Sequence, residues 1–211
     1  MPAPLITVTR QYGSGGSDIA RRTATTLAWT VIDNEFVDEV ARRAGLPAEE
    51  VAAREERAPG LLERLARTLA VASPEMFVTA AGVPRVGVDE ATIVTVTERI
   101  ITEAAAGGRV VLVGRGAQAI LGQRPESLHV YVVASRTWRM QRAIERLGVA
   151  PDDAGRVLDE TDRGRDRYVN EHYGRDRQNP ANYDMVLNAE RLTIEGAAAA
   201  LVTEVRRRGW D

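Results

Sequence analysis

Residues 5–17 read LITVTRQYGSGGS, and this stretch decides how the rest of the sequence is interpreted. Its first five residues are a short continuous apolar run, which predicts a buried strand, and a helical pattern follows the last glycine. The turn between strand and helix, residues 10–17, lies where a phosphate-binding P-loop belongs. Glycines at Gly13, Gly15 and Gly16 let successive backbone N–H groups point inward, and the N-terminus of the helix adds partial positive charge at the same place.

The turn matches the P-loop template G-x-x-x-x-G-K-[ST] only in part. With Gly15 on the second glycine, Arg10 takes the position of the first glycine and Gly16 that of the lysine. Taken alone, the match fits a plain strand-to-helix turn as well as a phosphate cradle. If it is a cradle, Ser17 takes the place of the hydroxyl that binds Mg²⁺, and the expected nucleotide-binding residues are Arg10, Gly13, Ser14, Gly15, Gly16 and Ser17.

The chain contains no lysine, because all 28 of its Lys and Arg residues are arginine. A compositional bias that also enriches alanine is the simplest reason. In a P-loop the lysine supplies a cation at the β- and γ-phosphates, so here only Arg10 or an arginine from another segment can supply one. A guanidinium is a planar fork, not a flexible point charge, and would approach phosphate from a different direction. Asp18, in the first turn of the helix, is expected to repel a polyphosphate.

Four more short apolar runs predict strands, and they alternate with helical patterns. They are residues 29–32, 109–113, 129–133 and 185–187. The helical patterns include residues 35–45, residues 47 to about 72, a helix that Ser135 can cap, and a last helix that Thr193 can cap. Continuous rather than alternating apolar runs favour a mostly parallel sheet covered by helices on both faces. Ligands of such sheets bind beyond the carboxyl ends of the strands, so residues that directly follow a strand become candidates for a site.

The composition fits one α/β domain, or one core that carries a small inserted segment. The chain has 211 residues, 44% of them hydrophobic, a formal net charge of -2 and no cysteine. These values give no basic footprint for nucleic acid and exclude thiolate chemistry. No apolar run is long enough to cross a bilayer, so we expect no membrane partner and a cytoplasmic protein. His129 and His172 lie in segments of different character, so no imidazole metal site is expected. The oligomeric state stays open.

Five blocks in order resemble the cytidylate kinase-like family. They are residues 6–16, residues 27–29 with Asp33, residues 113–116, the pattern Asp162-x-x-Arg165-x-x-Tyr168, and residues 182–188. The resemblance spans nearly the whole chain, and the order and spacing of the blocks are more specific than any single one. It implies a three-layer P-loop NTPase fold with a five-stranded parallel sheet of adenylate-kinase type. It also implies an acceptor-binding insertion at residues 38–88 and an arginine-rich lid at residues 159–180, both within one domain.

The resemblance also implies roles for particular residues, with ATP and Mg²⁺ as the ligands. Arg115 matches the arginine that holds the acceptor phosphate in true CMP kinases. Arg139 and Arg142 match arginines that the family carries in the helix that opens at Ser135. The lid arginines that close over the transferring phosphoryl group match Arg163, Arg165 and Arg167. Asp33 fits two roles equally: a helix N-cap, or an acceptor for Mg²⁺-bound water or the ribose of the acceptor.

The sequence departs from CMP kinases where they bind the acceptor. Asn34 stands in place of a serine that helps to hold cytosine, Asp38-Glu39 stand where an arginine for the acceptor phosphate is expected, and Gly116 stands in place of an aspartate. The arginines and aspartates of residues 162–177, taken without the resemblance, would form a solvated helix face joined by ion pairs.

Three functions remain in view. The first is a nucleoside-monophosphate kinase that transfers the ATP γ-phosphoryl group to a small phosphorylated acceptor. The second, motivated by the missing lysine, is a nucleotide-binding sensor or interaction protein with weak or no catalytic activity. The third is a kinase for a non-nucleotide alcohol or acid, which rests only on the altered acceptor residues.

Overall fold

The computed structural model of the chain describes residues 3–33, 90–122 and 124–211. The proposed insertion at residues 38–88 lies outside these ranges, as do the helices predicted from Glu35 to Gly45 and from Pro47 to about Ala72. That part of the predicted organisation stays a prediction. Within the described ranges no helix combines the length and the apolar character that crossing a bilayer requires.

A five-stranded parallel sheet forms the centre of the molecule, in the order β2-β3-β1-β4-β5. The strands are β1 (Leu5–Arg10), β2 (Thr30–Ile32), β3 (Val110–Val113), β4 (Ser127–Val133) and β5 (Met185–Asn188). In the register, Val8 of β1 lies opposite Val113 on one side and Val130 on the other. The predicted sheet is thereby confirmed, and β1, which carries the glycine loop at its end, is its central strand.

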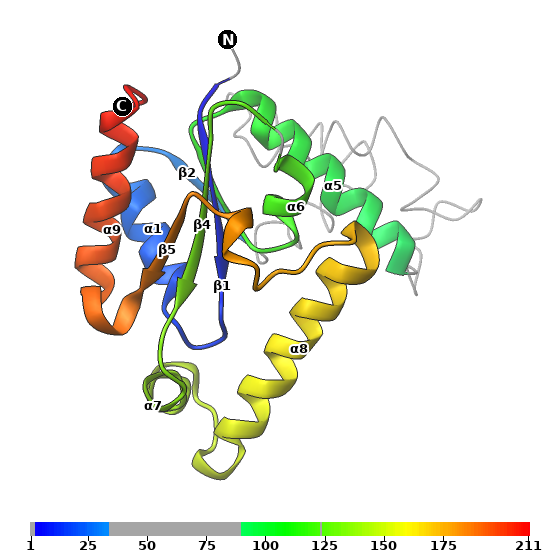
Figure 1. The fold of residues 1–211 in the computed structure, drawn as a ribbon, viewed down its shortest axis with the longest axis vertical. Coiled ribbons are helices and arrows are strands. Elements are labelled where there is room, and N and C mark those ends of the chain that lie inside the picture. Colours follow the sequence, from blue (N-terminus) through cyan, green and yellow to red (C-terminus); the bar gives the residue numbers. More distant parts are fainter. Residues whose placement is uncertain (1–2, 34–89, 123) are drawn as a thin grey trace, which may run out of the picture.

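Helices cover both faces of the sheet, giving the three layers expected from the sequence (Figure 1). The α-helices are α1 (Gly16–Leu27), α5 (Glu90–Gly107), α6 (Ala117–Leu121), α7 (Arg136–Leu147), α8 (Ala154–Tyr173) and α9 (Ala189–Arg207); short 3₁₀ turns occur at Pro151–Asp153 and Pro180–Asn182. Helices α1 and α9 pack together on one face, and α5 and α6 lie on the other (Figure 1). Helices α7 and α8 lie at the carboxyl ends of the strands, where a site is expected.

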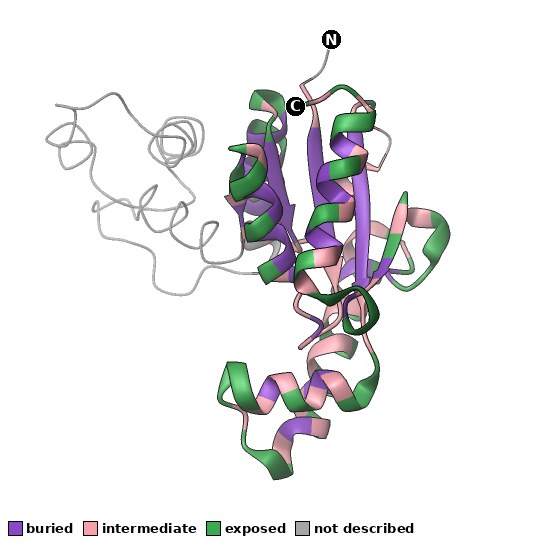
Figure 2. Ribbon diagram, turned by 90° about the vertical axis from the view of Figure 1, so that its left-hand side faces the viewer, coloured by how far each residue is buried: buried purple, intermediate pink, exposed green. Residues whose placement is uncertain are grey.

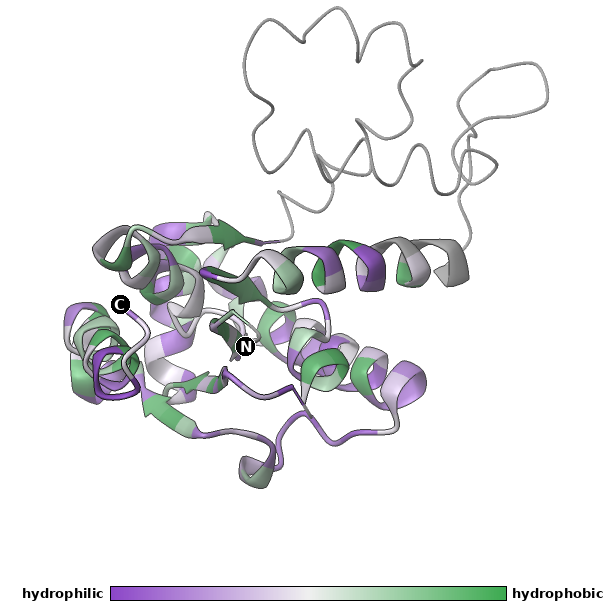
Figure 3. Cartoon of the chain, turned by 90° about the horizontal axis from the view of Figure 1, so that it is seen from above, coloured by the Kyte–Doolittle hydropathy of each residue, from purple (hydrophilic) through white to green (hydrophobic). Residues whose placement is uncertain are grey.

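The apolar strands make the core. The three inner strands β1, β3 and β4 are buried along most of their length, whereas the edge strands β2 and β5 are partly exposed and the helices are exposed on their outer sides (Figure 2). Seen from above, strands made of hydrophobic residues lie between helices that carry both hydrophobic and hydrophilic residues (Figure 3). Ile19 and Ala24 of α1 are fully buried in this core together with Leu201 of α9, as the helical pattern after the glycines predicts. Burying such side chains stabilises the fold by roughly 1.5–3 kcal/mol each for the larger ones.

Local signals set the helix ends that flank the site. Ser135 caps α7 as predicted, because its side chain accepts a hydrogen bond from the backbone N–H of Trp138 at 3.2 Å. The last helix begins earlier than the sequence indicated: Asn188 caps it, and Thr193, expected as the cap, lies at a kink with φ of 62°. The Thr193 hydroxyl accepts a hydrogen bond from the N–H of Gly196, so it caps the part of the helix beyond the kink.

Candidate active site

The glycine loop between β1 and α1 depends on left-handed backbone conformations. Gly13 has φ of 75° and Gly15, the N-cap residue of α1, has φ of 78°, a region that side chains with a Cβ rarely adopt. A Cβ at Gly13 would lie 2.6 Å from the carbonyl oxygen of Arg139, so the loop lies directly against the backbone of α7. The predicted loop is therefore held from behind by the helix that Ser135 opens.

Several backbone N–H groups of the loop find no acceptor within the described part of the chain. Among the described residues, none accepts a hydrogen bond from the N–H of Gly13 or of residues 15–17. The N–H of Tyr12, in contrast, donates to Oδ1 of Asp162 at 2.9 Å. Amides without acceptors at the start of a helix, together with the positive end of the helix dipole, form an anion-binding concavity.

The carboxylate of Asp18 is neutralised by neighbouring arginines. Arg142 of α7 forms an ion pair with Asp18, and Arg21 lies 3.8 Å from the same carboxylate. Arg142 also lies over the ring of Trp138, 5.1 Å from its centroid. The repulsion of polyphosphate expected from Asp18 is offset by these two cations.

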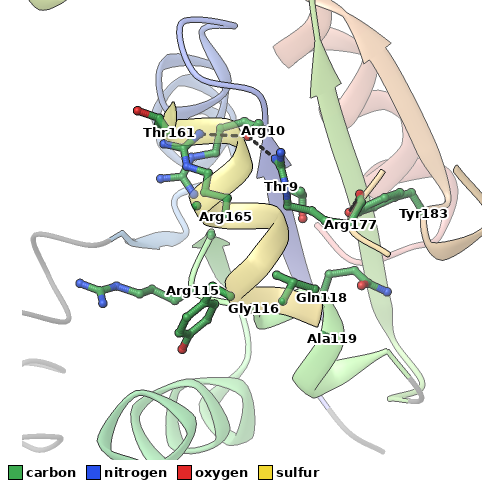
Figure 4. A pocket seen from close by; sticks show the side chains of 14 residues that line it. Thr9, Arg10, Arg115, Gly116, Gln118, Ala119, Thr161, Arg165, Arg177 and Tyr183 are labelled. Atoms are coloured by element: carbon green, nitrogen blue, oxygen red, sulfur yellow. Dashed lines mark hydrogen bonds between the residues drawn. The ribbon is translucent and has the colours of Figure 1, made fainter. Parts of the chain in front are cut away.

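Helix α8, the predicted lid, packs onto the glycine loop through a polar network. Arg165 Nη1 and Arg177 Nη1 donate to the carbonyl oxygen of Arg10 at 3.1 and 3.0 Å (Figure 4). Asp162 receives the Tyr12 N–H and forms an ion pair with Arg139 at 2.6 Å. The predicted lid therefore lies against the loop through both its arginines and its acidic residues.

Arg177 is a central member of this network that the sequence did not single out. Arg177 is only 5% exposed, and its Nε donates a hydrogen bond to Oδ1 of Asp166 at 2.6 Å. The guanidinium also lies over the ring of Tyr131, 5.9 Å from the centroid. Because Arg177 follows the end of α8 at Tyr173, helical spacing alone does not connect it with Arg165.

The three predicted lid arginines do not share one environment. Arg165 faces the loop and lies over the ring of Tyr12, 5.7 Å from its centroid. Arg163 and Arg167 are exposed. Residues four apart on a helix share a face, whereas a residue two positions away lies nearly opposite. The structure thus brings Arg165 to the site and leaves the other two on the outer face of α8.

Arg115 lies in a strained turn between β3 and α6. Gly114, Arg115 and Gly116 all have positive φ, of 77°, 52° and 70°. An arginine in this region costs conformational energy of order 1 kcal/mol, and such strain concentrates at functional sites. A Cβ at Gly116 would lie 2.5 Å from the ring of Tyr173, so α8 also packs against this second turn.

Two cavities meet at the carboxyl end of β1. The first, of about 370 Å³, is lined by the turn that carries Arg115 and by one face of α8 (Figure 4). The second, of about 290 Å³, is lined by the glycine loop, including Ser17, and by Arg142. Arg10 and Arg165 line both cavities. Phosphate groups bound in the two cavities would therefore share two guanidinium groups.

Two other predicted acceptor-binding residues lie beside these cavities. Asp33 follows β2 and forms an ion pair with Arg21 at 3.1 Å. Arg139 is buried in its pair with Asp162 and donates to the carbonyl oxygen of Tyr12 at 3.3 Å. Neither is among the described residues that line the two cavities. Their assignment to the acceptor stays a prediction; the observed contacts of Arg139 are those of a residue that positions the loop.

The site contains cations but few groups for a metal ion. In the described part of the chain no three His, Asp or Glu side chains are placed to hold one. Ser17 lies in the first turn of α1 and lines the loop cavity. Mg²⁺ that enters with a nucleotide keeps several waters and needs only one or two protein ligands, and Ser17 suits that kind of site.

The electrostatic environment of Arg10 is unfavourable for a cation in the absence of an anion. Burial, and then the neighbouring charges of Arg165 and Arg177, lower the pKa of Arg10 to about 9, while Asp33 acts in the opposite direction. Because a bound phosphate would stabilise the protonated guanidinium, this environment favours an anionic ligand.

The fold defines the class to which the protein belongs. An uncharacterized protein from Eubacterium ventriosum ATCC 27560 superimposes with a TM-score of 0.68 at 18% identity, covering 96% of this chain and 98% of that one. A shikimate kinase from Bacteroides thetaiotaomicron superimposes with a TM-score of 0.52 at 15% identity, covering 96% and 98%. The chain therefore has the P-loop kinase fold. No curated protein sequence matches it.

The family follows from the sequence match. The model of the cytidylate kinase-like family matches residues 5–191, which is most of the chain. The protein belongs to this family, as the five sequence blocks indicated.

Proposed function

We propose that the protein is a nucleoside-monophosphate kinase of the cytidylate-like type, which transfers the γ-phosphoryl group of MgATP to a phosphate oxygen of a small acceptor. The observation that supports this most is the pair of cavities that share Arg10 and Arg165. A phosphotransferase must hold a donor and an acceptor so that the transferring group lies between them. Two cavities with common cations at their junction suit that requirement.

The loop cavity is the proposed donor site. The N–H groups of Gly13 and residues 15–17 would hold the phosphates, and the hydroxyl of Ser17 would bind the accompanying Mg²⁺. Arg139 keeps the loop in place through Asp162 and the carbonyl of Tyr12. Mg²⁺ supplies charge neutralisation between the β- and γ-phosphates when it is bound.

The other cavity is the proposed acceptor site. Arg10, Arg115, Arg165 and Arg177 line it, and no carboxylate is among the described residues that line it. This charge favours an acceptor that carries a phosphate. In the reaction, an oxygen of that phosphate forms a bond to the γ-phosphorus while the bond to the β–γ bridging oxygen breaks, and ADP leaves with the electron pair. An ionised phosphate oxygen has no proton to lose, so no general base is required.

A panel assay tests this proposal. Formation of ADP is measured with MgATP and each of the common ribo- and deoxyribonucleoside monophosphates, with inorganic phosphate and shikimate as acceptors of other classes. We expect turnover with at least one monophosphate, and a strong loss in Arg115→Ala. Absence of acceptor-dependent ADP formation across the panel would refute the kinase.

A sensor without turnover is the second candidate, and one contact favours it. Asp162 accepts the hydrogen bond from the Tyr12 N–H, so this amide of the glycine loop is used within the protein and cannot at the same time hold a phosphate. Tight, Mg²⁺-dependent ATP binding in a calorimeter, with no transfer to any acceptor, would support the sensor over the kinase.

A further inference from the structure

In the P-loop template a glycine stands at the position of Arg10 and a lysine at the position of Gly16, so this chain has the basic residue and the glycine the other way round. The structure shows that the two residues are neighbours. A Cβ at Gly16 would lie 2.5 Å from Cβ of Arg10 and 3.1 Å from its Cγ. Cβ atoms do not approach each other so closely in packed proteins. The aliphatic part of the Arg10 side chain therefore occupies the space that the Cβ of a lysine at position 16 would need.

The far end of Arg10 reaches the second glycine turn. A Cβ at Gly114 would lie 1.8 Å from Nη1 of Arg10, so the guanidinium lies against the backbone at the end of β3. The side chain thus extends from the N-terminus of α1 toward β3, along the junction of the two cavities, where Arg165 approaches from α8 (Figure 4). Gly16 provides room for its stem and Gly114 for its charged end.

Arg10 also differs from the neighbouring arginines in its ion pairing. Arg165 lies 3.9 Å from Asp162, and Arg177 lies 2.6 Å from Asp166. Within the described ranges, no carboxylate comes within 4.0 Å of the Arg10 guanidinium. A largely buried cation with no ion-pair partner in these ranges favours an anionic ligand, because an unpaired buried charge is costly.

We propose that Arg10 and Gly16 together replace the P-loop lysine, with Arg10 as the catalytic residue that binds the phosphoryl group during transfer. This inference rests on the proposed function, since it assigns the cation of the same site. From its position Arg10 contacts the γ-phosphoryl group on the side that faces the acceptor, whereas a P-loop lysine reaches it from the first turn of the helix. Its charge stabilises the negative charge that develops as the bond to the bridging oxygen breaks.

Replacing the charge while keeping the stem is the first test. Arg10→Met is compared with Arg206→Met, a matched change of an exposed arginine at the end of α9. We expect Arg10→Met to lower kcat on the order of 100-fold and to abolish the preference for ATP over AMP in calorimetry, while Arg206→Met retains both. The melting temperature of unliganded Arg10→Met should equal or exceed that of the wild type. Wild-type kcat and ATP preference in Arg10→Met would overturn the assignment.

Exchanging the two residues is the second test, and it separates a catalytic role from a structural one. Gly16→Lys alone should lower the melting temperature because of the clash with Arg10, and Arg10→Gly alone should lose activity. The double variant R10G/G16K restores the template, so we expect it to melt higher than Gly16→Lys and to exceed Arg10→Gly at least tenfold in kcat. A folded double variant no more active than Arg10→Gly would overturn the exchange.

The failure of the proposed function gives a different result from the failure of this inference. A wild type that binds ATP but transfers nothing refutes the kinase, and the ATP preference of Arg10→Met still decides whether Arg10 is the phosphate-binding cation. A wild type that binds no nucleotide refutes both.

Discussion

The two sides of α8 carry the same kinds of residue but differ in what those residues do. On the inner side, Asp162 and Arg165 contact the backbone of the glycine loop, and both are largely buried. On the outer side, Asp159 pairs with Arg136 while both are about half exposed, and Arg163 is exposed. A dense run of Arg and Asp is therefore not one functional unit. Its role divides along the helical period, which places one stripe on the site and the other in solvent.

Replacing one arginine on each side of α8 should give the largest difference, which we expect in kcat. We expect Arg165→Ala to lower kcat on the order of 100- to 1,000-fold, because Arg165 lines both cavities and would face the transferring group. Arg163→Ala should stay within about twofold of the wild type, because its charge lies in solvent. Steady-state kinetics with the best acceptor of the panel measure kcat for both variants. Equal losses in the two variants would contradict the division of the helix.

Replacing one aspartate on each side of α8 tests the same division of the helix, here through the free energy of unfolding. Asp162→Ala leaves Arg139 without its ion-pair partner and removes the acceptor of the Tyr12 N–H, so we expect a loss of about 3 kcal/mol in the free energy of unfolding. Asp159→Ala removes an exposed pair and should cost less than about 1 kcal/mol. Urea unfolding of both variants measures the difference, and a cost for Asp159→Ala as large as that for Asp162→Ala would argue against it.

Arg177→Lys tests the contacts that the segment after α8 makes with the inner side of the helix and with the glycine loop. A lysine keeps the charge but cannot contact Asp166 and the carbonyl of Arg10 at the same time through a planar fork. We expect a loss of about 1–2 kcal/mol in unfolding free energy, from one or two buried hydrogen bonds, together with a lower kcat. Wild-type stability in this variant would show that the charge of Arg177, and not its geometry, holds this segment against the glycine loop.

Gly164→Ala should have the smallest effect and the opposite sign. Gly164 lies inside α8, and a Cβ built there would meet no atom within 4 Å. Alanine is favoured over glycine in a helix interior, so the unfolding free energy should rise by about 0.5–1 kcal/mol. Thermal unfolding of the unliganded protein checks this, and a lower melting temperature would show that the cavity face of α8 tolerates no side chain there.

Much of the fold could be predicted because its signals are local. Each strand is a continuous apolar run, and β4 begins only two residues before the predicted range of 129–133. Helix α6 was not predicted, since its five residues are too few to show a helical period. The start of α9 was misplaced because Thr193, a good capping residue, does cap a helical segment, but only the part beyond the kink.

The candidate site could be predicted only where the chain itself brings residues together. The glycine loop and Arg115 follow strands of one parallel sheet, so their meeting at one edge follows from the topology. The separation of Arg165 from Arg163 was available from helical spacing. The contacts of Arg177 and the closeness of Arg10 to Gly16 were not, because they depend on how α8 and the loop fold back in space.

Binding of a dinucleoside pentaphosphate, with adenosine at one end and cytidine at the other, tests whether the two cavities form one transfer site. If the two cavities hold a donor and an acceptor around shared arginines, this compound links both occupants and should bind at least tenfold more tightly than ATP in a calorimeter. The gain should disappear in Arg165→Ala. If the wild type binds this compound no more tightly than ATP, and compounds with every other base at the acceptor end give the same result, a shared transfer site is contradicted.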